Sequence, residues 1–138
     1  MKVSEVMTRE IHTCTDSDTL TECARQMAAH NIGLLPVLDG NGQLFGVITD
    51  RDMVIGPVAG GLDVRSERVG DFTRRQLITG EPGMDIEEAA DLMSENQIRR
   101  LPVVDDGKLI GIVALGDLAV KAEEQLVGNA LHAISMPA

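Results

Sequence analysis

The sequence predicts a mixed α/β fold built from two tandem β-α-β-β-α repeats, and three observations support this prediction. The chain of 138 residues contains one phrase twice, NIGLLPVLDGNGQLFGVITDRD at 31–52 and QIRRLPVVDDGKLIGIVALGD at 97–117. Each phrase follows a stretch whose apolar residues have helical spacing. Each phrase also joins two short apolar runs through a glycine turn, which is the pattern of a β-hairpin.

The repeat extends well beyond these phrases. A shift of 66 residues aligns 3–39 with 69–105 without a gap, and eleven of the 37 pairs are identical. One residue fewer in the second glycine turn changes the shift to 65, after which Gly46 aligns with Gly111 and Asp52 with Asp117. A unit of about 50 residues buries too little surface to be stable alone. We therefore expect the two repeats to pack as a pseudo-twofold pair.

Each repeat is expected to form a short three-stranded sheet flanked by helices. Thr19 and Asp85 are each followed three residues later by a glutamate, the pattern of a capping box at a helix start. A second helix should begin after Thr49 and after Ala114. The expected strands are 11–14, 34–38 and 44–48 in the first repeat, and 77–79, 101–104 and 109–113 in the second.

The repeats set the expected domain boundaries. The first repeat covers 1–60, a linker covers 61–68, and the second repeat covers 69–119. Residues 120–138 are expected to form a C-terminal helix or tail that packs on the pair or on a partner. Gly56-Pro57 should shorten or kink the last helix of the first repeat, because proline lacks an amide hydrogen and clashes one turn back.

Composition narrows the function classes. The formal net charge of −10 disfavours nucleic acid and anionic membranes as partners. The chain contains two Phe but neither Trp nor Tyr, which disfavours single-stranded nucleic acid, because its bases stack on aromatic side chains. No apolar run approaches the roughly 20 residues that cross a bilayer, and the residues after Met1 do not form the apolar core expected of a signal peptide. These features predict a cytoplasmic protein. No nucleophile-base arrangement, pair of catalytic carboxylates or phosphate loop is recognisable, so we expect a protein that is not an enzyme.

The repeated motifs resemble a tandem pair of CBS domains, also called a Bateman module, of the small stand-alone bacterial type. The resemblance rests on GVITDRD at 46–52, IRRLPVVD at 98–105 and GIVALGDLA at 111–119, and it covers 3–119. It implies a regulatory, energy-sensing module that binds an adenosine-containing ligand in the cleft between the repeats. AMP, ADP, ATP and S-adenosylmethionine are the implied ligands, and no cofactor is required. Such modules commonly form homodimers, here with an unidentified protein effector.

Two interpretations of Thr49-Asp-Arg-Asp52 remain open. A Thr and an acid three residues apart at a strand-to-helix junction form a capping box. The same helix start could bind a phosphate, while a carboxylate accepts hydrogen bonds from both ribose hydroxyls. The resemblance implies the second role, with Thr49 on phosphate, Asp52 on ribose and Arg51 supplying a cation.

Arg99 and Arg100 likewise have two interpretations. Adjacent arginines can be solvated surface charges, or they can form an anion site with bidentate reach to phosphate. The positions aligned with them in the first repeat are Gly33 and Leu34, so the arginine pair is not part of the shared scaffold.

The resemblance implies two clefts of unequal quality. The good site would combine the Thr and Asp of the first repeat with the arginines of the second. The weaker site lacks the hydroxyl, because the second repeat has Ala114 at the position of Thr49. It lacks both arginines, because the first repeat has Gly33 and Leu34 at their positions. The good site is expected to contain Val47, Thr49, Arg51, Asp52, Ile78, Thr79, Arg99, Arg100 and Pro102, and the weaker site His12, Thr13, Gly33, Leu34, Pro36 and Asp117.

Two rival functions are carried forward. The chain could be a ligand-free structural or protein-interaction module whose C-terminal helix docks a partner. A redox or metal sensor using His12 and Cys14 is the other rival, although two ligands fall short of a zinc site. Cys23 lies on the apolar stripe of the first helix and is expected in the core, so no metal site is predicted.

Overall fold

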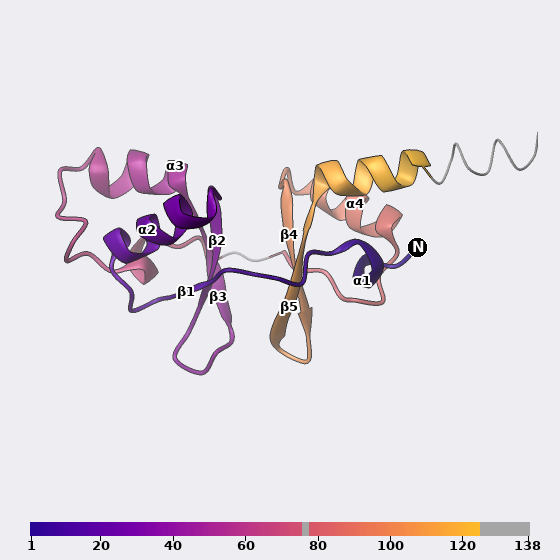
Figure 1. Ribbon diagram of the computed structural model, residues 1–138, viewed down its shortest axis with the longest axis horizontal. Helices are drawn as coiled ribbons and strands as arrows, with labels where there is room; N and C mark the ends of the chain where they lie inside the picture. Colours follow the sequence, from indigo (N-terminus) through magenta and orange to yellow (C-terminus); the bar gives the residue numbers. More distant parts are fainter. Residues whose placement is uncertain (76–77, 125–138) are drawn as a thin grey trace, which may run out of the picture. The chain divides into compact units, whose positions relative to one another are not determined.

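The computed structural model describes residues 1–75 and 78–124, and Figure 1 shows its mixed α/β architecture. The predicted fold class, two repeats with short sheets flanked by helices, is confirmed. The chain divides into two compact units. The first-repeat unit contains Ile11–Leu77 and Asp106–Leu109, and the second-repeat unit contains Met1–Glu10, Ile78–Asp105 and Ile110–Ala138.

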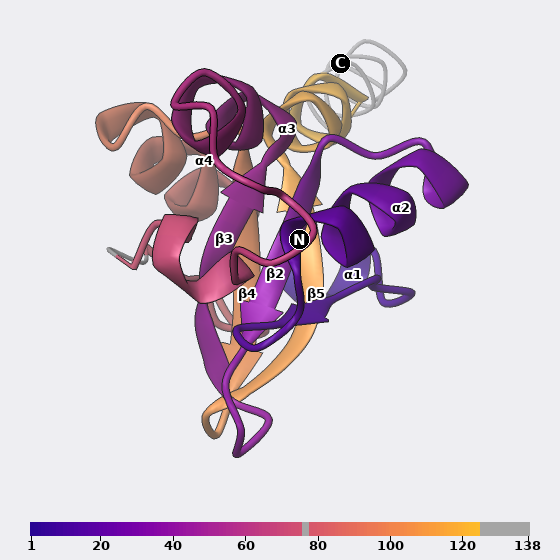
Figure 2. The same ribbon diagram turned by 90° about the vertical axis from the view of Figure 1, so that its left-hand side faces the viewer.

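The first-repeat unit is a three-stranded sheet covered on one face by helices (Figures 1 and 2). The strand order is β1-β2-β3, with β1 parallel to β2 and β2 antiparallel to β3. A 3-10 turn, η2 (Val69–Phe72), follows the helices. The other elements are β1 (Cys14–Thr15), α2 (Leu20–His30), β2 (Leu34–Leu38), β3 (Leu44–Thr49), α3 (Asp50–Met53) and the π-helix η1 (Val54–Val58).

Helix α2 begins and ends where its sequence predicts. The Thr19 hydroxyl accepts a hydrogen bond from the Glu22 amide at 3.2 Å, and the Glu22 carboxylate accepts one from the Thr19 amide at 3.4 Å. This confirms the first capping box. Asn31 ends the helix with a positive φ of 52°. Of the apolar stripe predicted on α2, Leu20, Cys23 and Met27 are buried and Ala24 is exposed. With β2 and β3 the buried residues form a core that includes Leu35, Val37 and Ile48.

The second helix of the first repeat is shortened, as predicted. Its α-helical part ends at Met53, and the chain continues as the π-helix η1 with Pro57 inside. Residues 61–68, expected as a linker, contact the start of α2. The Leu20 amide donates to the Glu67 carbonyl at 3.0 Å, and the Thr21 amide donates to the Val64 carbonyl at 3.0 Å.

The second-repeat unit repeats this plan with a two-stranded sheet within the described residues. Its elements are α1 (Val3–Val6), α4 (Ile86–Glu95), β4 (Arg100–Asp105) and β5 (Lys108–Ala114), and residues 115–124 are helical. Ile86, Ala89 and Met93 of α4 are buried against strand residues such as Leu101, Val103 and Val113. The remainder of the predicted C-terminal helix, 125–138, lies outside the described residues.

The strand predicted at 77–79 is not formed in the described part of that range. A single parallel bridge joins Gly80 to Val103, at the position where Cys14 pairs with Val37 in the first repeat. The bridge is not extended because the chain turns immediately afterwards, with the Met84 amide donating to the Glu81 carbonyl at 3.1 Å. In the first repeat, too, the strand is short and starts at Cys14, later than the predicted 11–14.

The capping box predicted at Asp85 is wrong. The Asp85 side chain makes no capping hydrogen bond to α4. Its carboxylate instead lies 3.0 Å from the Lys2 ammonium. An antiparallel bridge between Lys2 and Asp85 places the two side chains together, so the carboxylate has a cationic partner in place of the helix amide.

The segments that lead into the two repeats, at Thr8 and at Arg74, each pair with a strand of the other repeat. We call them the leading segments. Arg74 and Val47 exchange two backbone hydrogen bonds, of 3.0 and 3.3 Å, in the first-repeat unit. Thr8 and Ile112 exchange two, of 2.8 and 3.0 Å, in the second-repeat unit. Both approaches pass over a glycine of the strand. None of the helices within 1–75 and 78–124 has the length and apolar content needed to cross a bilayer.

Candidate ligand-binding site

Thr49 and Asp52 lie at the junction where β3 passes into α3. The Thr49 hydroxyl accepts from the Asp52 amide at 3.1 Å, and Oδ2 of Asp52 accepts from the Thr49 amide at 3.0 Å. The capping box is therefore formed. A hydroxyl that accepts a hydrogen bond still has its own hydrogen to donate, so capping leaves the Thr49 hydroxyl able to bind a ligand oxygen.

The other oxygen of Asp52 is held by Arg74, a residue that the sequence reasoning missed. Nε and Nη2 of Arg74 donate to Oδ1 of Asp52 at 3.1 and 2.8 Å. The Asp52 side chain is 10% exposed and the Arg74 side chain 63% exposed. The available signal was the break in the repeat at this position, where Arg74 aligns with Thr8.

Several other predicted residues share the first-repeat unit with this junction. Val47 is half-buried on β3 and pairs with Pro36 of β2, while Thr49 pairs with Leu34. Arg51 is exposed on α3. The Asp50 amide donates to the Gly33 carbonyl at 2.9 Å, which fixes the loop before β2 against the start of α3.

A side chain at position 33 would contact the exposed carboxylate of Asp50. A Cβ at that position would lie 3.0 Å from Oδ2 of Asp50. The aligned residue of the second repeat is Arg99, so the arginine found there could not be accommodated at position 33 without displacing Asp50.

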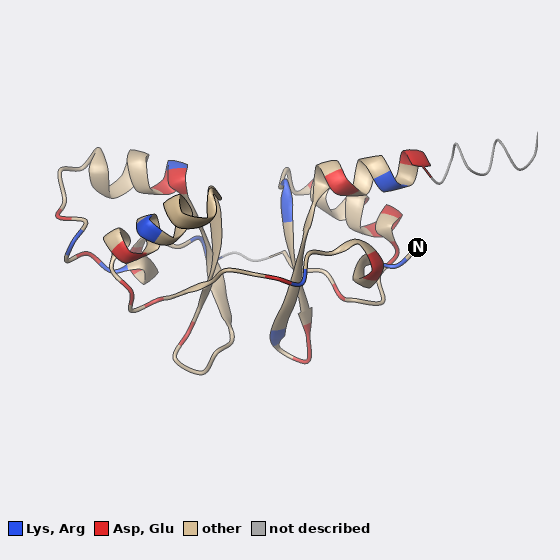
Figure 3. Ribbon diagram, viewed as in Figure 1, with Lys and Arg blue, Asp and Glu red and all other residues tan. Residues whose placement is uncertain are grey.

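The second-repeat unit contains the remaining predicted residues. Arg99 and Arg100 are both exposed at the start of β4, which is blue in Figure 3. The Leu115 amide donates to the Arg99 carbonyl at 2.9 Å, matching the bond between Asp50 and Gly33. Asp117 is exposed in the helical segment 115–124. Ile78 is half-buried, Thr79 is exposed and Pro102 is buried.

Each predicted cleft draws residues from both compact units. The structure brings Val47, Thr49, Arg51 and Asp52 together within one unit, and Arg99 and Arg100 together within the other. The combination of these two groups into one site remains a prediction.

His12 and His30 stack on one another in the first-repeat unit. Their ring centroids are 3.5 Å apart and their planes differ by 12°. One face of the His12 ring is therefore covered. Within the described residues, no group of three or more His, Cys, Asp or Glu side chains is arranged to hold a metal ion.

Cys14 has a different neighbour from the one its sequence context suggested. The Cys14 and Cys23 sulfur atoms lie 3.6 Å apart, and both side chains are buried in the core. The hydrogen bond with Cys23, followed by burial, raises the pKa of the Cys14 thiol far above its usual range. A thiol that stays protonated is a poor nucleophile and metal ligand, so packing is its better-supported role.

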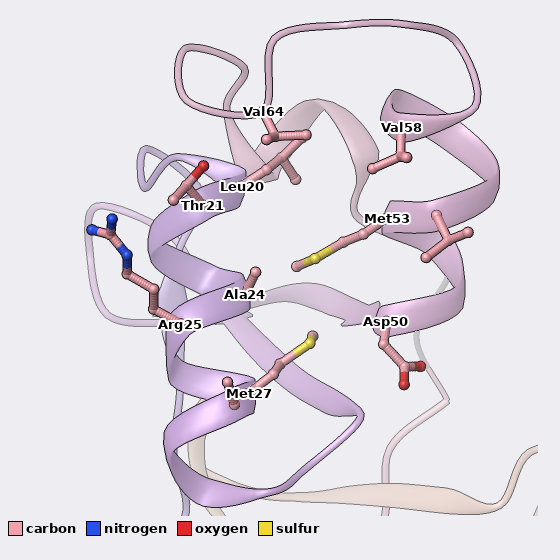
Figure 4. A pocket seen from close by; sticks show the side chains of 11 residues that line it. Leu20, Thr21, Ala24, Arg25, Met27, Asp50, Met53, Val58 and Val64 are labelled. Atoms are coloured by element: carbon pink, nitrogen blue, oxygen red, sulfur yellow. The ribbon is translucent and has the colours of Figure 1, made fainter.

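An apolar groove lies between α2 and the α3–η1 segment. Its volume is about 520 Å³. Figure 4 shows Met27 and Met53 pointing into it from the two sides, with Arg25 and Asp50 at its edge. Val54 and Val58 line the groove and are exposed by 58% and 55%, and the neighbouring Ile55 is exposed by 56%.

The duplicated hairpin-helix units and their paired junctions define a tandem-repeat α/β module. The sequence model of the CBS domain matches this chain twice, at residues 3–56 and 69–124. The chain belongs to the CBS domain family, and it contains a pair of these domains.

Two relatives are similar to this chain over nearly their full length. CBS domain-containing protein YhcV of Bacillus subtilis is 42% identical over 134 residues, covering 96% of this chain and 94% of the relative. The crystal structure of Hypoxic Response Protein I with two coordinated zinc ions has a TM-score of 0.79 and 33% identity, covering 88% of this chain and 98% of the other.

Two further structures contain adenosine ligands. CBSX2 in complex with AMP has a TM-score of 0.75 and 31% identity, covering 91% of this chain and 97% of the other. The CBS domain pair of MJ0100, in complex with 5'-methylthioadenosine and S-adenosyl-L-methionine, has a TM-score of 0.77 and 26% identity, covering 91% and 98%.

Proposed function

We propose that this CBS pair is a non-enzymatic regulatory module that binds an adenosine-containing ligand and senses the energy state of the cytoplasm. AMP, ADP and ATP are the leading candidates, with S-adenosylmethionine as a further one. The observation that carries the proposal is the Thr49–Asp52 junction, where a largely buried carboxylate lies beside a hydroxyl that can still donate. The AMP complex of a 31% identical relative supports the choice of ligand class.

The chemistry of the junction suits a nucleoside phosphate. The Asp52 carboxylate accepts hydrogen bonds from the ribose hydroxyls, and the Thr49 hydroxyl donates to a phosphate oxygen. The chain is strongly acidic, so an anionic ligand needs local cations. Arg51, Arg99 and Arg100 are exposed and supply them. The proposed site adds Val47, Ile78, Thr79 and Pro102 as its apolar and polar lining.

The asymmetry between the repeats gives the sharpest test of this function. Thr49→Ala and Asp52→Ala should each weaken binding at least about tenfold, because each removes a charge-assisted or ribose hydrogen bond. Asp117→Ala is the matched control and should change affinity by less than about twofold, since the second repeat carries Ala114 in place of the threonine. Isothermal titration calorimetry with AMP, ADP, ATP and S-adenosylmethionine measures these effects.

Two results of this titration would contradict the proposal. If no ligand binds the folded wild-type protein at millimolar concentration, the adenosine-binding function is wrong and a ligand-free interaction module takes its place. If Asp117→Ala weakens binding as much as Asp52→Ala, the claim of one good site and one weak site is wrong.

The proposal includes a homodimer that reports to a protein effector. The apolar groove beside α2 and the exposed Val54, Ile55 and Val58 form the surface we assign to the second copy. Arg25 on α2 and Asp91 on α4 occupy equivalent repeat positions with opposite charge, so a second copy can pair them. Val54→Asp should convert a dimer to a monomer in light-scattering measurements; an unchanged mass would exclude this surface.

A metal or redox sensor is not favoured for this chain. The related structure with two zinc ions makes zinc the obvious metal to try. A chelator should leave the melting temperature of this protein unchanged, because no suitable cluster occurs within the described residues. A melting temperature that falls on chelation and recovers with zinc would revive this alternative.

A further inference from the structure

Arg74 is a charged side chain at the proposed site that no part of the proposed ligand chemistry uses. Its backbone is fixed by two hydrogen bonds to Val47 of β3, and its guanidinium extends to Asp52. Gly46 permits this close approach, because a Cβ there would lie 2.4 Å from the Arg74 carbonyl oxygen. The guanidinium is thus held beside the carboxylate that we assign to ribose binding.

The Asp52 carboxylate is already well supplied with donors. Its Oδ2 accepts the Thr49 amide, and its Oδ1 accepts two N–H groups of Arg74. An ionised carboxylate offers about four lone-pair positions, of which these bonds use three. A ribose with two hydroxyl donors therefore needs a position that Arg74 occupies, and the two compete for Asp52.

The guanidinium can leave Asp52 without being buried elsewhere. The Arg74 side chain is 63% exposed, so water can solvate its N–H groups when the ion pair opens. Its backbone stays anchored to β3, so the positive charge remains within one side-chain length of the junction. Arginine pairs strongly with phosphate through two parallel hydrogen bonds. A phosphorylated ligand thus offers the displaced guanidinium a new partner, whereas an uncharged nucleoside does not.

We infer that Arg74 is a specificity-determining residue, which exchanges from Asp52 to the ligand's phosphate and makes the site prefer phosphorylated over unphosphorylated adenosine. This inference rests on the proposed function. Adenosine must displace Arg74 without replacing the lost ion pair, and AMP replaces it. The equivalent residue of the second-repeat unit, Thr8, carries no charge and can perform no such exchange.

The test compares adenosine with AMP on the full chain by calorimetry. Arg74→Met removes the competing cation and keeps a similar length. It should tighten adenosine binding about threefold and reduce the ratio of the AMP to the adenosine association constant about tenfold. Arg65→Met is the matched control, because it removes an equal charge from the same unit at an 82% exposed position that contacts Asp63. It should leave this ratio unchanged.

Arg74→Lys provides a second variant in case the methionine loosens residues 69–75. It retains the positive charge but not the two parallel hydrogen bonds, so it should keep only part of the preference for AMP. The NMR chemical shift of Arg74 Nε in wild-type protein reports directly on the partner of the guanidinium, and it should change on titration with AMP. An Arg74→Lys protein that treats the two ligands alike, or an Arg74 signal that does not move, would contradict the exchange.

The outcomes separate this inference from the function on which it rests. If neither ligand binds any folded variant, the adenosine-binding function fails and the inference fails with it. If both ligands bind wild-type protein in an Asp52-dependent way but Arg74→Met leaves their ratio unchanged, the function stands and the inference is wrong. In that case Arg74 is only a structural tie between residues 69–75 and the junction.

Discussion

The two strand-to-helix junctions of this protein have matching backbone hydrogen bonds and different side chains. In the first-repeat unit Thr49, Asp52 and Arg74 form a connected set of hydrogen bonds. The aligned residues of the second-repeat unit are Ala114, Asp117 and Thr8. Ala114 offers no hydroxyl, and Asp117 is exposed on the helical segment 115–124.

The backbone contacts around both junctions are nevertheless equivalent. Asp50 donates to Gly33 and Leu115 to Arg99, each at 2.9 Å. The leading segments also pair with β3 and β5 at equivalent positions. The fold therefore depends on the features that the repeats share, and the polar groups that differ are free to specialise one junction for a ligand.

The largest expected difference concerns the glycine over which each leading segment passes. A Cβ at Gly46 would lie 2.4 Å from both the Arg74 carbonyl oxygen and Cγ2 of Thr73. A Cβ at Gly111 would lie 2.5 Å from the sulfur of Met7, a flexible side chain that can move, and 3.1 Å from the Thr8 carbonyl oxygen. Gly46→Ala should cost about 2–3 kcal/mol of unfolding free energy and Gly111→Ala about 1 kcal/mol.

Urea unfolding of the two variants measures this difference. Gly40→Ala is a suitable control, because a Cβ there would meet nothing within 4 Å. Equal losses at Gly46 and Gly111 would mean that Met7 cannot adjust, and that the two leading segments are equally rigid.

The next effect concerns the helix caps. Thr49→Ala removes a formed cap and should lower the unfolding free energy by about 1 kcal/mol. Ala114→Thr places a threonine three residues before Asp117 and should raise it by up to about 1 kcal/mol, because it creates the capping box that the second repeat lacks. Thermal unfolding of both variants checks the pair, and a threonine at 114 with no stabilising effect would show that the second junction differs in backbone as well.

The smallest effect concerns the residues before the first helix of each repeat. The Lys2 ammonium holds the pKa of the Asp85 carboxyl below its usual value, through a hydrogen bond and through charge attraction. Because the pKa is lower in the folded state, Asp85 stabilises the protein above the ordinary aspartate pKa of about 4, and this contribution is lost as the pH falls below it. The aligned pair in the first-repeat unit, Arg68 and Thr19, lacks the carboxylate.

Asp85→Asn should therefore reduce the loss of stability between about pH 5 and pH 3. The change is expected to be small, because both side chains of the ion pair are exposed. Urea midpoints measured across this range for wild-type and variant protein test it, and parallel curves would show that the ion pair does not contribute.

The sequence was sufficient for the elements that depend on local patterns. The α2 helix, its Thr19 cap and the hairpins follow from residues close together in the chain, and the duplication supplied the helix and the hairpin twice. Pro57 predicted a shortened helix, although its continuation as a π-helix depends on hydrogen-bond choices that the pattern does not specify. Asp85 failed as a cap because Lys2, 83 positions earlier, pairs with it instead.

The candidate site was predicted in part for the same reason. Thr49 and Asp52 are three residues apart, so their capping box can be read locally. Arg74 is 22 residues from Asp52, and only the pairing of its segment with β3 brings the two together. The partnership of Cys14 with Cys23 was missed in the same way, since it depends on the packing of α2 on β1.

The exchanged leading segments make the two repeats inseparable. A half-length chain of residues 1–60 would carry the segment that pairs with Ile112 and would lack the one that pairs with Val47. Two such half-length chains could each complete their sheet only by exchanging their first residues, as domain-swapped dimers do. The present protein corresponds to that swapped dimer joined into one polypeptide. Separate expression of either repeat should therefore yield an incomplete fold.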